Sequence, residues 1–147
     1  MQEYPHHYAA GANAGEDGEI TLSSTRLPNL ASAAPAEFGG PGDRWSPETL
    51  LVAAVADCFV LTFRAIARLS KFKWISLTCD VVGTLDRVDR VPQFTGFDVR
   101  ARLIVPPGAN VEQAQRLMVK AEQGCLITRS LKGPSHLEAT VEETSPT

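Results

Sequence analysis

Apolar side chains are concentrated in one run, residues 50–69, where they cover every side of a helical wheel. Ser46 precedes this run and is a good N-cap, because its hydroxyl can accept a hydrogen bond from an unpaired amide of the first turn. Pro47 suits the first helical position, where its missing N–H costs nothing. Glu48 then places a negative charge near the positive end of the helix dipole. The pattern predicts a long helix that begins at Pro47.

Two charged residues indicate where this helix lies. A helix that is apolar all round either spans a membrane or is buried inside a protein. Asp57 and Arg64 interrupt the run, and each would cost about 2.5–3.5 kcal/mol at the centre of a bilayer. The capped start also suits a soluble domain. We therefore predict a buried central helix and no membrane partner.

Short strands are expected before the helix, and polar and apolar residues alternate over residues 19–23. The pattern predicts strands over residues 4–13, 19–23 and 27–33, and the Asp-Gly step at Asp17 favours a hairpin of the first two. Residues 34–45 form a Pro/Gly-rich loop that leads to the helix.

A second β region follows the helix. Apolar and polar residues alternate over residues 75–81 and again over residues 97–105, with a polar turn at residues 86–90 between them. Two strands of this kind form an antiparallel hairpin with one buried and one solvated face.

An amphipathic helix is expected after this hairpin. Asn110 is its predicted cap, and Gly124 ends it. Its apolar stripe follows the i, i+3, i+4, i+7 spacing of a helix: Ala114, Leu117, Met118 and Ala121. Residues 126–131 are expected to form another helical turn, and residues 137–141 a last strand.

These elements have the order βββ-α-ββ-α-β, which is an α+β fold. At 147 residues the chain has the length of one domain, and we expect a single domain over residues 1–147. The elements supply too little surface to cover the central helix on all sides. We therefore expect an obligate homodimer.

Composition narrows the function classes. The net charge is −3, the sequence pI is near 5.6, and the chain has no basic block, which argues against a nucleic-acid partner. Residues 1–18 lack the apolar core of a signal peptide, and three widely spaced cysteines do not make a secreted disulfide scaffold. We expect a cytoplasmic protein. His6 and His7 would point to opposite faces of a strand, so they do not form a shared metal site.

The three cysteines have different surroundings in the sequence. Cys79 is on the inward face of a predicted strand, where a free cysteine is commonly a small buried hydrophobe. Cys58 lies in the middle of the central helix, beside Asp57. Cys125 follows the helix-ending Gly124 and begins a helical turn, whose exposed N–H groups would lower the pKa of its thiol. Spacing alone says nothing about contact between Cys58 and Cys125, so a functional pair stays open at this point.

Three segments carry a resemblance to a known family. They are Phe38-Gly39-Gly40-Pro41-Gly42, the helix start from Ser46-Pro47-Glu48-Thr49 to Asp57-Cys58-Phe59, and Lys120-Ala121-Glu122-Gln123-Gly124-Cys125-Leu126-Ile127 with Ser130-Leu131-Lys132. With two cysteine motifs in this order, the chain resembles the OsmC/Ohr family of osmotically inducible and organic hydroperoxide resistance proteins. The resemblance extends from the loop before the helix to the final strand.

The resemblance implies an intertwined α+β homodimer with two active sites at the subunit interface, and thiol peroxidase chemistry on organic hydroperoxides. By the matching positions, Cys58 attacks the peroxide and becomes a sulfenic acid, and Cys125 resolves it as a disulfide. An external dithiol, thioredoxin-like or lipoyl-linked in relatives, then reduces the disulfide. No metal or organic cofactor is needed.

Glu48 matches the glutamate that the family uses in its active site. It is about 15 Å from Cys58 along one continuous helix, so we expect it to act across a dimer in which the two central helices run antiparallel. The simpler interpretation is that Glu48 only favours the helix N-terminus. Relatives also use an arginine from the first-strand turn or the loop before the helix, and neither position is an arginine here. Arg44 is the first candidate for a substitute and Arg26 the second.

Two hypotheses follow. The first is a hydroperoxide reductase for hydrophobic organic peroxides, because Phe59, Phe63 and Leu126 flank the thiols with apolar surface. The second is a stress-related or small-molecule-binding dimer with little peroxidase activity. The missing arginine favours the second hypothesis, and the retention of both cysteines favours the first.

Overall fold

The computed structural model describes residues 2–145, and the chain forms two compact units, Met1–Leu50 and Leu51–Thr147. Each unit has its own three-stranded sheet. The expectation of one domain over residues 1–147 stays a prediction.

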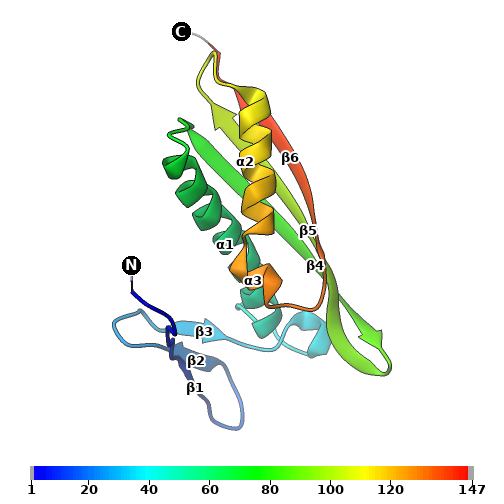
Figure 1. Ribbon diagram of the computed structural model, residues 1–147. Helices are drawn as coiled ribbons and strands as arrows, with labels where there is room; N and C mark the ends of the chain where they lie inside the picture. Colours follow the sequence, from blue (N-terminus) through cyan, green and yellow to red (C-terminus); the bar gives the residue numbers. More distant parts are fainter. Residues whose placement is uncertain (1, 146–147) are drawn as a thin grey trace. The chain divides into compact units, whose positions relative to one another are not determined.

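The N-terminal unit contains a small antiparallel sheet in the order β1-β2-β3 (Figure 1). Its strands are β1 (Gly11–Asn13), β2 (Ile20–Ser23) and β3 (Leu30–Ser32), followed by the short 3-10 helix η1 (Ala36–Phe38). The expected first strand is wrong over residues 4–10. Pro5 has no N–H to give to a ladder, and Tyr4 and Tyr8 are 82% and 90% exposed, so no apolar face holds this segment on a sheet.

Helix α1 (Pro47–Leu69) begins where the sequence predicts. The Ser46 hydroxyl accepts a hydrogen bond from the Thr49 N–H at 3.1 Å, and the Thr49 hydroxyl accepts one from the Ser46 N–H at 2.9 Å. This reciprocal pair is a capping box, with Thr49 in the place usually taken by Glu or Gln. Ser46 is therefore an N-cap, as expected, and the cap fixes where the helix starts.

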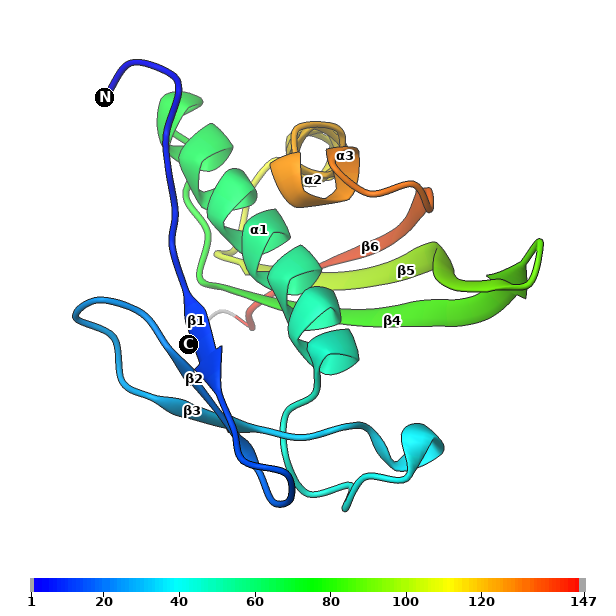
Figure 2. The same cartoon turned by 90° about the horizontal axis from the view of Figure 1, so that it is seen from below.

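The C-terminal unit is a mixed sheet in the order β4-β5-β6, and Figures 1 and 2 show α1 and α2 on the same side of it. Strands β4 and β5 pair antiparallel, and β5 and β6 pair parallel. The parallel pairing needs a crossover, which α2 and the following helical turn α3 provide. The elements are β4 (Ser76–Val88), β5 (Val91–Val105), α2 (Val111–Gln123), α3 (Leu126–Arg129) and β6 (Ser135–Glu143). The α+β order predicted from the sequence is confirmed.

The β4–β5 hairpin is longer than expected and its turn is tighter. Only Asp89 and Arg90 lie between the strands, with φ of 51° and 68°. Two consecutive residues with positive φ form the type I′ turn whose twist matches that of an antiparallel ribbon. Most of the polar segment expected as a turn is therefore paired strand.

A single apolar core fills the space between the sheet and the two helices. Along β5, buried apolar residues alternate with exposed polar residues, as the sequence predicts. Asn110 caps α2 by accepting a hydrogen bond from the Gln113 N–H at 3.0 Å, and this fixes the apolar stripe of α2 over the sheet. The fully buried residues include Phe59, Phe63, Ala67, Phe97, Leu103, Val105, Ala114, Met118 and Ala121.

Burial of α1 is confined to one face. Its buried residues are Val55, Phe59, Phe63 and Ala67, whereas Leu61 is 51% and Leu69 is 85% exposed. By length and composition alone α1 could span a membrane, but its buried stripe packs on a sheet, as in the core helix of a soluble protein. Within one chain, therefore, only one face of α1 is buried, and the homodimer stays a prediction.

Candidate active site

Cys58 lies on α1 with its sulfur beside the next turn of the same helix. The sulfur is 3.8 Å from the Thr62 hydroxyl oxygen, within hydrogen-bonding range for sulfur. Residues four apart on a helix are neighbours on its surface, so helix geometry alone brings these two groups together. Cys58 is half-buried and its thiol is free.

Cys125 is the N-cap residue of α3, directly after Gly124 ends α2. Its side chain is only 2% exposed. Its carbonyl oxygen accepts hydrogen bonds from the Thr128 hydroxyl at 3.0 Å and from the Arg129 N–H at 3.1 Å. The expected helical turn after Gly124 is therefore present, and it fixes the backbone that carries the second cysteine.

The Cys58 sulfur also contacts the start of α3. Burial raises the pKa of the Cys58 thiol, but hydrogen bonds from the Ile127 amide and the Cys125 thiol lower it. The Thr62 hydroxyl and the Leu126 amide lower it further, and the net pKa falls below the ordinary value for cysteine. All of these donors are uncharged. The thiolate of Cys58 is therefore stabilised by dipoles.

The pKa of the Cys125 thiol shifts in the opposite direction. Burial raises the pKa of its thiol, the Thr128 hydroxyl and amide lower it, and the neighbouring Cys58 raises it, so that the net pKa is above the ordinary value. The expectation that the amides of the new turn lower the pKa of Cys125 overall is wrong. The Thr128 amide acts in that direction, but burial outweighs it, and the amides of Leu126 and Ile127 act on Cys58 instead.

Cys79 is the third free thiol, on β4. Its side chain packs against the core, as the sequence predicts for a small buried hydrophobe. Burial raises its pKa to about 11, helped by the charge of Asp80 and by Cys125. Cys79 is therefore protonated at neutral pH and is a poor nucleophile.

The geometry of Cys58 and Cys125 suits two-step thiol chemistry. Cys58, whose pKa is lowered, is the better thiolate, and the neighbouring Cys125, whose pKa is raised, keeps its proton. A thiolate attacks an electrophile, and a thiol in contact with the product can then condense with it. The two thiols therefore lie close enough to influence each other, and a functional pair stays a prediction.

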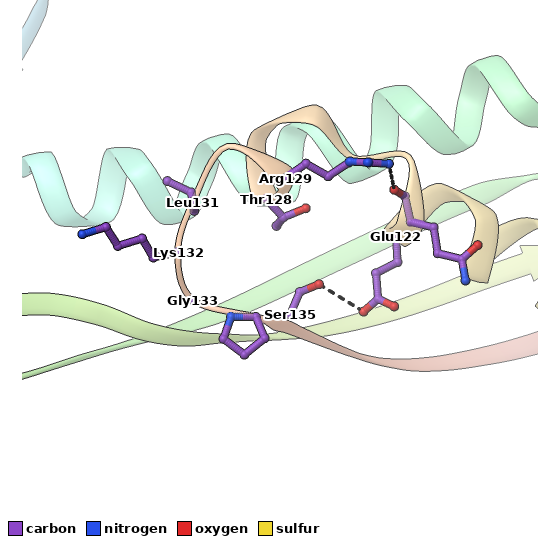
Figure 3. A pocket seen from close by; sticks show the side chains of 9 residues that line it. Glu122, Thr128, Arg129, Leu131, Lys132, Gly133 and Ser135 are labelled. Carbon is purple, nitrogen blue, oxygen red and sulfur yellow. Dashed lines mark hydrogen bonds between the residues drawn. The ribbon is translucent and has the colours of Figure 1, made fainter. Parts of the chain in front are cut away.

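A cleft of about 460 Å³ lies beside the segment that follows Cys125, and hydrogen bonds between its lining residues hold this segment (Figure 3). Arg129 reaches back from α3 and donates to the Gln123 carbonyl at the end of α2, at 3.3 Å. The Ser135 hydroxyl at the start of β6 donates to the Glu122 carboxylate at 3.4 Å. These bonds tie both ends of the α3 segment to α2, so the position of Cys125 depends on few flexible residues.

Glu48 lies in the first turn of α1, about 15 Å along the helix axis from Cys58. Its Oε1 atom is buried and has no hydrogen-bond partner, alone among the buried side-chain oxygens and nitrogens of residues 2–145. A buried unpaired polar atom costs about 1–3 kcal/mol. The orphaned oxygen is therefore a group that a further partner would stabilise.

Arg44 is in the N-terminal unit and already has partners. Its Nε atom is 2.9 Å from Glu19 Oε2, and its Nη1 atom is 3.2 Å from Asp43 Oδ2. The second candidate, Arg26, is an exposed turn residue with φ of 66°. A catalytic role for either arginine stays a prediction.

Two of the residues expected to flank the thiols with apolar surface lie in the core instead. Phe59 and Phe63 are 1% and 0% exposed and belong to the core, so the expectation that they give the thiols an apolar surface is wrong. Both residues belong to the buried stripe of α1, which faces the core. Leu126 is 65% exposed and is available. Sequence reasoning missed Thr62, although its spacing of four from Cys58 was a usable signal.

No group of three or more His, Cys, Asp or Glu side chains in residues 2–145 could hold a metal ion. We therefore assign no residue of the described chain to a metal.

Comparison with known proteins identifies the family. A family model described as OsmC-like protein matches residues 40–140, which include both cysteine segments. The chain belongs to the OsmC-like family. Its mixed α+β fold is that of the family's solved structures: an organic hydroperoxide resistance protein OsmC from Legionella pneumophila is 25% identical, with a TM-score of 0.73, over 95% of this chain and 99% of that one.

Two relatives cover most of this OsmC-like chain. The organic hydroperoxide resistance protein of Xanthomonas axonopodis pv. citri (strain 306) is 30% identical over 84% of this chain and 85% of its own length. The uncharacterized protein YmaD of Bacillus subtilis (strain 168) is 28% identical over 93% of this chain and 95% of its own. Membership of the family and these names support a stress-related, peroxidase-like role.

Proposed function

We propose that this protein is a thiol-dependent peroxidase that reduces organic hydroperoxides through Cys58 and Cys125. The observation that carries the proposal is that the two thiols lie close enough to shift each other's pKa, in opposite directions that favour the thiolate of Cys58 and leave Cys125 protonated. The hydroperoxide resistance proteins among its relatives support the choice of substrate class.

The reaction begins with attack of the Cys58 thiolate on the distal peroxide oxygen. The O–O bond breaks, the alkoxide leaves and takes up a proton to become the alcohol, and Cys58 becomes a sulfenic acid. The Cys125 thiol then attacks this sulfur, loses its proton and displaces water, which leaves a Cys58–Cys125 disulfide. An external dithiol, thioredoxin-like or lipoyl-linked, supplies two electrons and two protons by exchange and restores both thiols.

The active enzyme is a homodimer in this proposal. The half-exposed apolar α1 supports it, since Leu61 and Leu69 would be covered by a second copy. Glu48 then reaches the Cys58 of the other chain, and the orphaned Oε1 atom supports a partner that one chain does not supply. Arg44 is the candidate for the family's arginine, and we place the protein in the cytoplasm. Sedimentation tests the assembly: a stable, folded monomer at micromolar concentration would contradict it.

The alternative is an OsmC-like, stress-related or small-molecule-binding dimer with little peroxidase activity. The ion pairs of Arg44 with Glu19 and Asp43 favour this alternative, because a guanidinium held by two carboxylates is less available to a peroxide.

A steady-state assay separates the two functions. The protein is supplied with a dithiol and with either an alkyl hydroperoxide or hydrogen peroxide, and turnover should be faster with the alkyl hydroperoxide. Cys58→Ser should abolish turnover, because a hydroxyl at neutral pH is far less nucleophilic than a thiolate. Cys79→Ser is the matched control and should leave the rate close to that of the wild type. Wild-type turnover by Cys58→Ser would exclude the peroxidase and favour the binding dimer.

A further inference from the structure

Thr62 is the one hydroxyl side chain hydrogen-bonded to the Cys58 sulfur within residues 2–145. Its hydroxyl oxygen is 3.8 Å from the Cys58 sulfur. Its methyl group faces α2, because a Cβ built on Gly124 would lie 3.5 Å from Thr62 Cγ2. One side chain is therefore hydrogen-bonded to the proposed attacking cysteine and lies next to the residue that precedes the proposed resolving cysteine.

The direction of the hydrogen bond depends on the charge of the sulfur. In the neutral pair, either the thiol or the hydroxyl can donate. A thiolate has no proton, so only the Thr62 hydroxyl can donate to it. Hydrogen bonds to an anion are roughly twice as strong as neutral ones, so this contact strengthens when Cys58 ionises.

We propose that Thr62 is a positioning residue for the peroxidase step, which holds the Cys58 thiolate by a hydrogen bond from its hydroxyl and seats α1 against Gly124 by its methyl group. The proposal rests on the proposed function for its catalytic meaning. Its physical content is the stabilisation of one ionised sulfur, which is measured without any peroxide.

Few other charges face this sulfur. Cys125 faces it from the start of α3, and Cys79 on β4 is close enough to Cys125 for their charges to interact. The donors that lower the pKa of Cys58 are two backbone amides, the Cys125 thiol and the Thr62 hydroxyl. The amides do not change with substitution, so Thr62 is the donor that a mutation can remove without touching either thiol.

Two substitutions separate the hydroxyl from the methyl group. Thr62→Val removes the hydroxyl and keeps the β-branched shape, so the contact with Gly124 stays. Thr62→Ser keeps the hydroxyl and removes the methyl group. Thermal unfolding of both variants reports any loss of packing and is the control for a purely structural role.

The readout is the pKa of Cys58, from the pH dependence of iodoacetamide alkylation resolved by peptide mass analysis. Thr62→Val should raise this pKa by about half a unit to one unit, which is a 3- to 10-fold loss of thiolate at any pH below both pKa values, as expected for one lost hydrogen bond. Thr62→Ser should stay within about 0.3 units of the wild type. An unchanged pKa in Thr62→Val, or an equal rise in both variants, would overturn the proposal.

Peroxide kinetics give a second, independent readout. A thiolate of higher pKa is intrinsically more nucleophilic, with a Brønsted coefficient of about 0.4–0.5. Below both pKa values, the loss of thiolate outweighs this gain in nucleophilicity, so Thr62→Val should react with alkyl hydroperoxide more slowly than the wild type. Above both pKa values it should react as fast or faster. Rate profiles that stay parallel at all pH values would contradict thiolate stabilisation. If no variant or wild type reduces peroxide, the proposed function fails, while the alkylation result still decides the role of Thr62.

Discussion

Gly83→Ala tests how closely α1 must approach the sheet. Gly83 is on β4, and a Cβ there would lie 2.8 Å from Val52 Cγ2 on α1 and 3.0 Å from Phe94 Cε1 on β5. Favourable carbon–carbon contacts are about 3.5–4.0 Å, so the new methyl group overlaps Val52 by about 0.7 Å or more. Valine has one strongly preferred rotamer in a helix, so Val52 has little freedom to turn away and α1 itself must shift.

The size of the effect follows from two opposing contributions. Overpacking a core contact costs about 1–3 kcal/mol. Replacing glycine by alanine recovers about 0.4–1 kcal/mol by restricting the unfolded chain. The net loss in the free energy of unfolding is therefore about 0–2.6 kcal/mol, with about 1.3 kcal/mol at the middle of the range, and it lowers Tm by up to about 8 °C for a chain of this length. Because α1 carries Cys58, the peroxide rate should fall as well.

Thermal and urea unfolding measure this loss, with Gly15→Ala as the matched control. A Cβ at Gly15 has no atom within 4 Å, so this variant should be as stable as the wild type or slightly more stable. Adding Val52→Ala to Gly83→Ala should cost less than the sum of the single changes, because it removes one side of the overlap. Equal stability of Gly83→Ala and Gly15→Ala would refute the close approach of α1 to β4.

Three further predictions concern the cysteines and Glu48. Cys125→Ser should consume about one equivalent of peroxide, then stall and pass to the sulfinic acid under excess oxidant; sustained turnover in stopped-flow and mass analysis would argue against its resolving role. Glu48→Gln should keep the fold, because it replaces a buried unpaired carboxylate oxygen with a neutral amide of the same shape, and should slow the first oxidation step; an unchanged oxidation rate would leave Glu48 only a helix-terminus role. A thiolate forms as the pH rises through the pKa, so alkylation should label Cys58, whose pKa is lowered, at a lower pH than Cys79, which should react only near its pKa of about 11; labelling of Cys79 before Cys58 would contradict this order.

The elements predicted well are those with a strong local signal. Ser46 and Asn110 have side chains that can satisfy amides of the next turn, so they mark helix starts without tertiary information. The alternation along β5 has a period of two, which only a strand with one buried face satisfies. The expected first strand is wrong over residues 4–10, where Pro5 cannot donate to a ladder and Tyr4 and Tyr8 stay exposed.

The candidate site was harder to predict because it depends on contacts between distant segments. The sequence does not indicate that the amides of Leu126 and Ile127 lower the pKa of Cys58, since these residues are more than 60 positions apart along the chain. The same packing buries Cys125, which reversed the expected direction of its pKa shift. The inward direction of Phe59 and Phe63 followed from the buried stripe of α1, which an all-round apolar sequence does not specify.

Peptide mapping of the oxidised protein tests the central claim most directly. The reduced protein, with its free Cys58, Cys79 and Cys125, is treated with one equivalent of an alkyl hydroperoxide, blocked with a thiol reagent and digested without reductant. The proposed mechanism predicts a disulfide between Cys58 and Cys125 of one chain, with Cys79 recovered as the blocked thiol. A disulfide that contains Cys79, or a lasting sulfenic acid on Cys58 with Cys125 still a thiol, would contradict it.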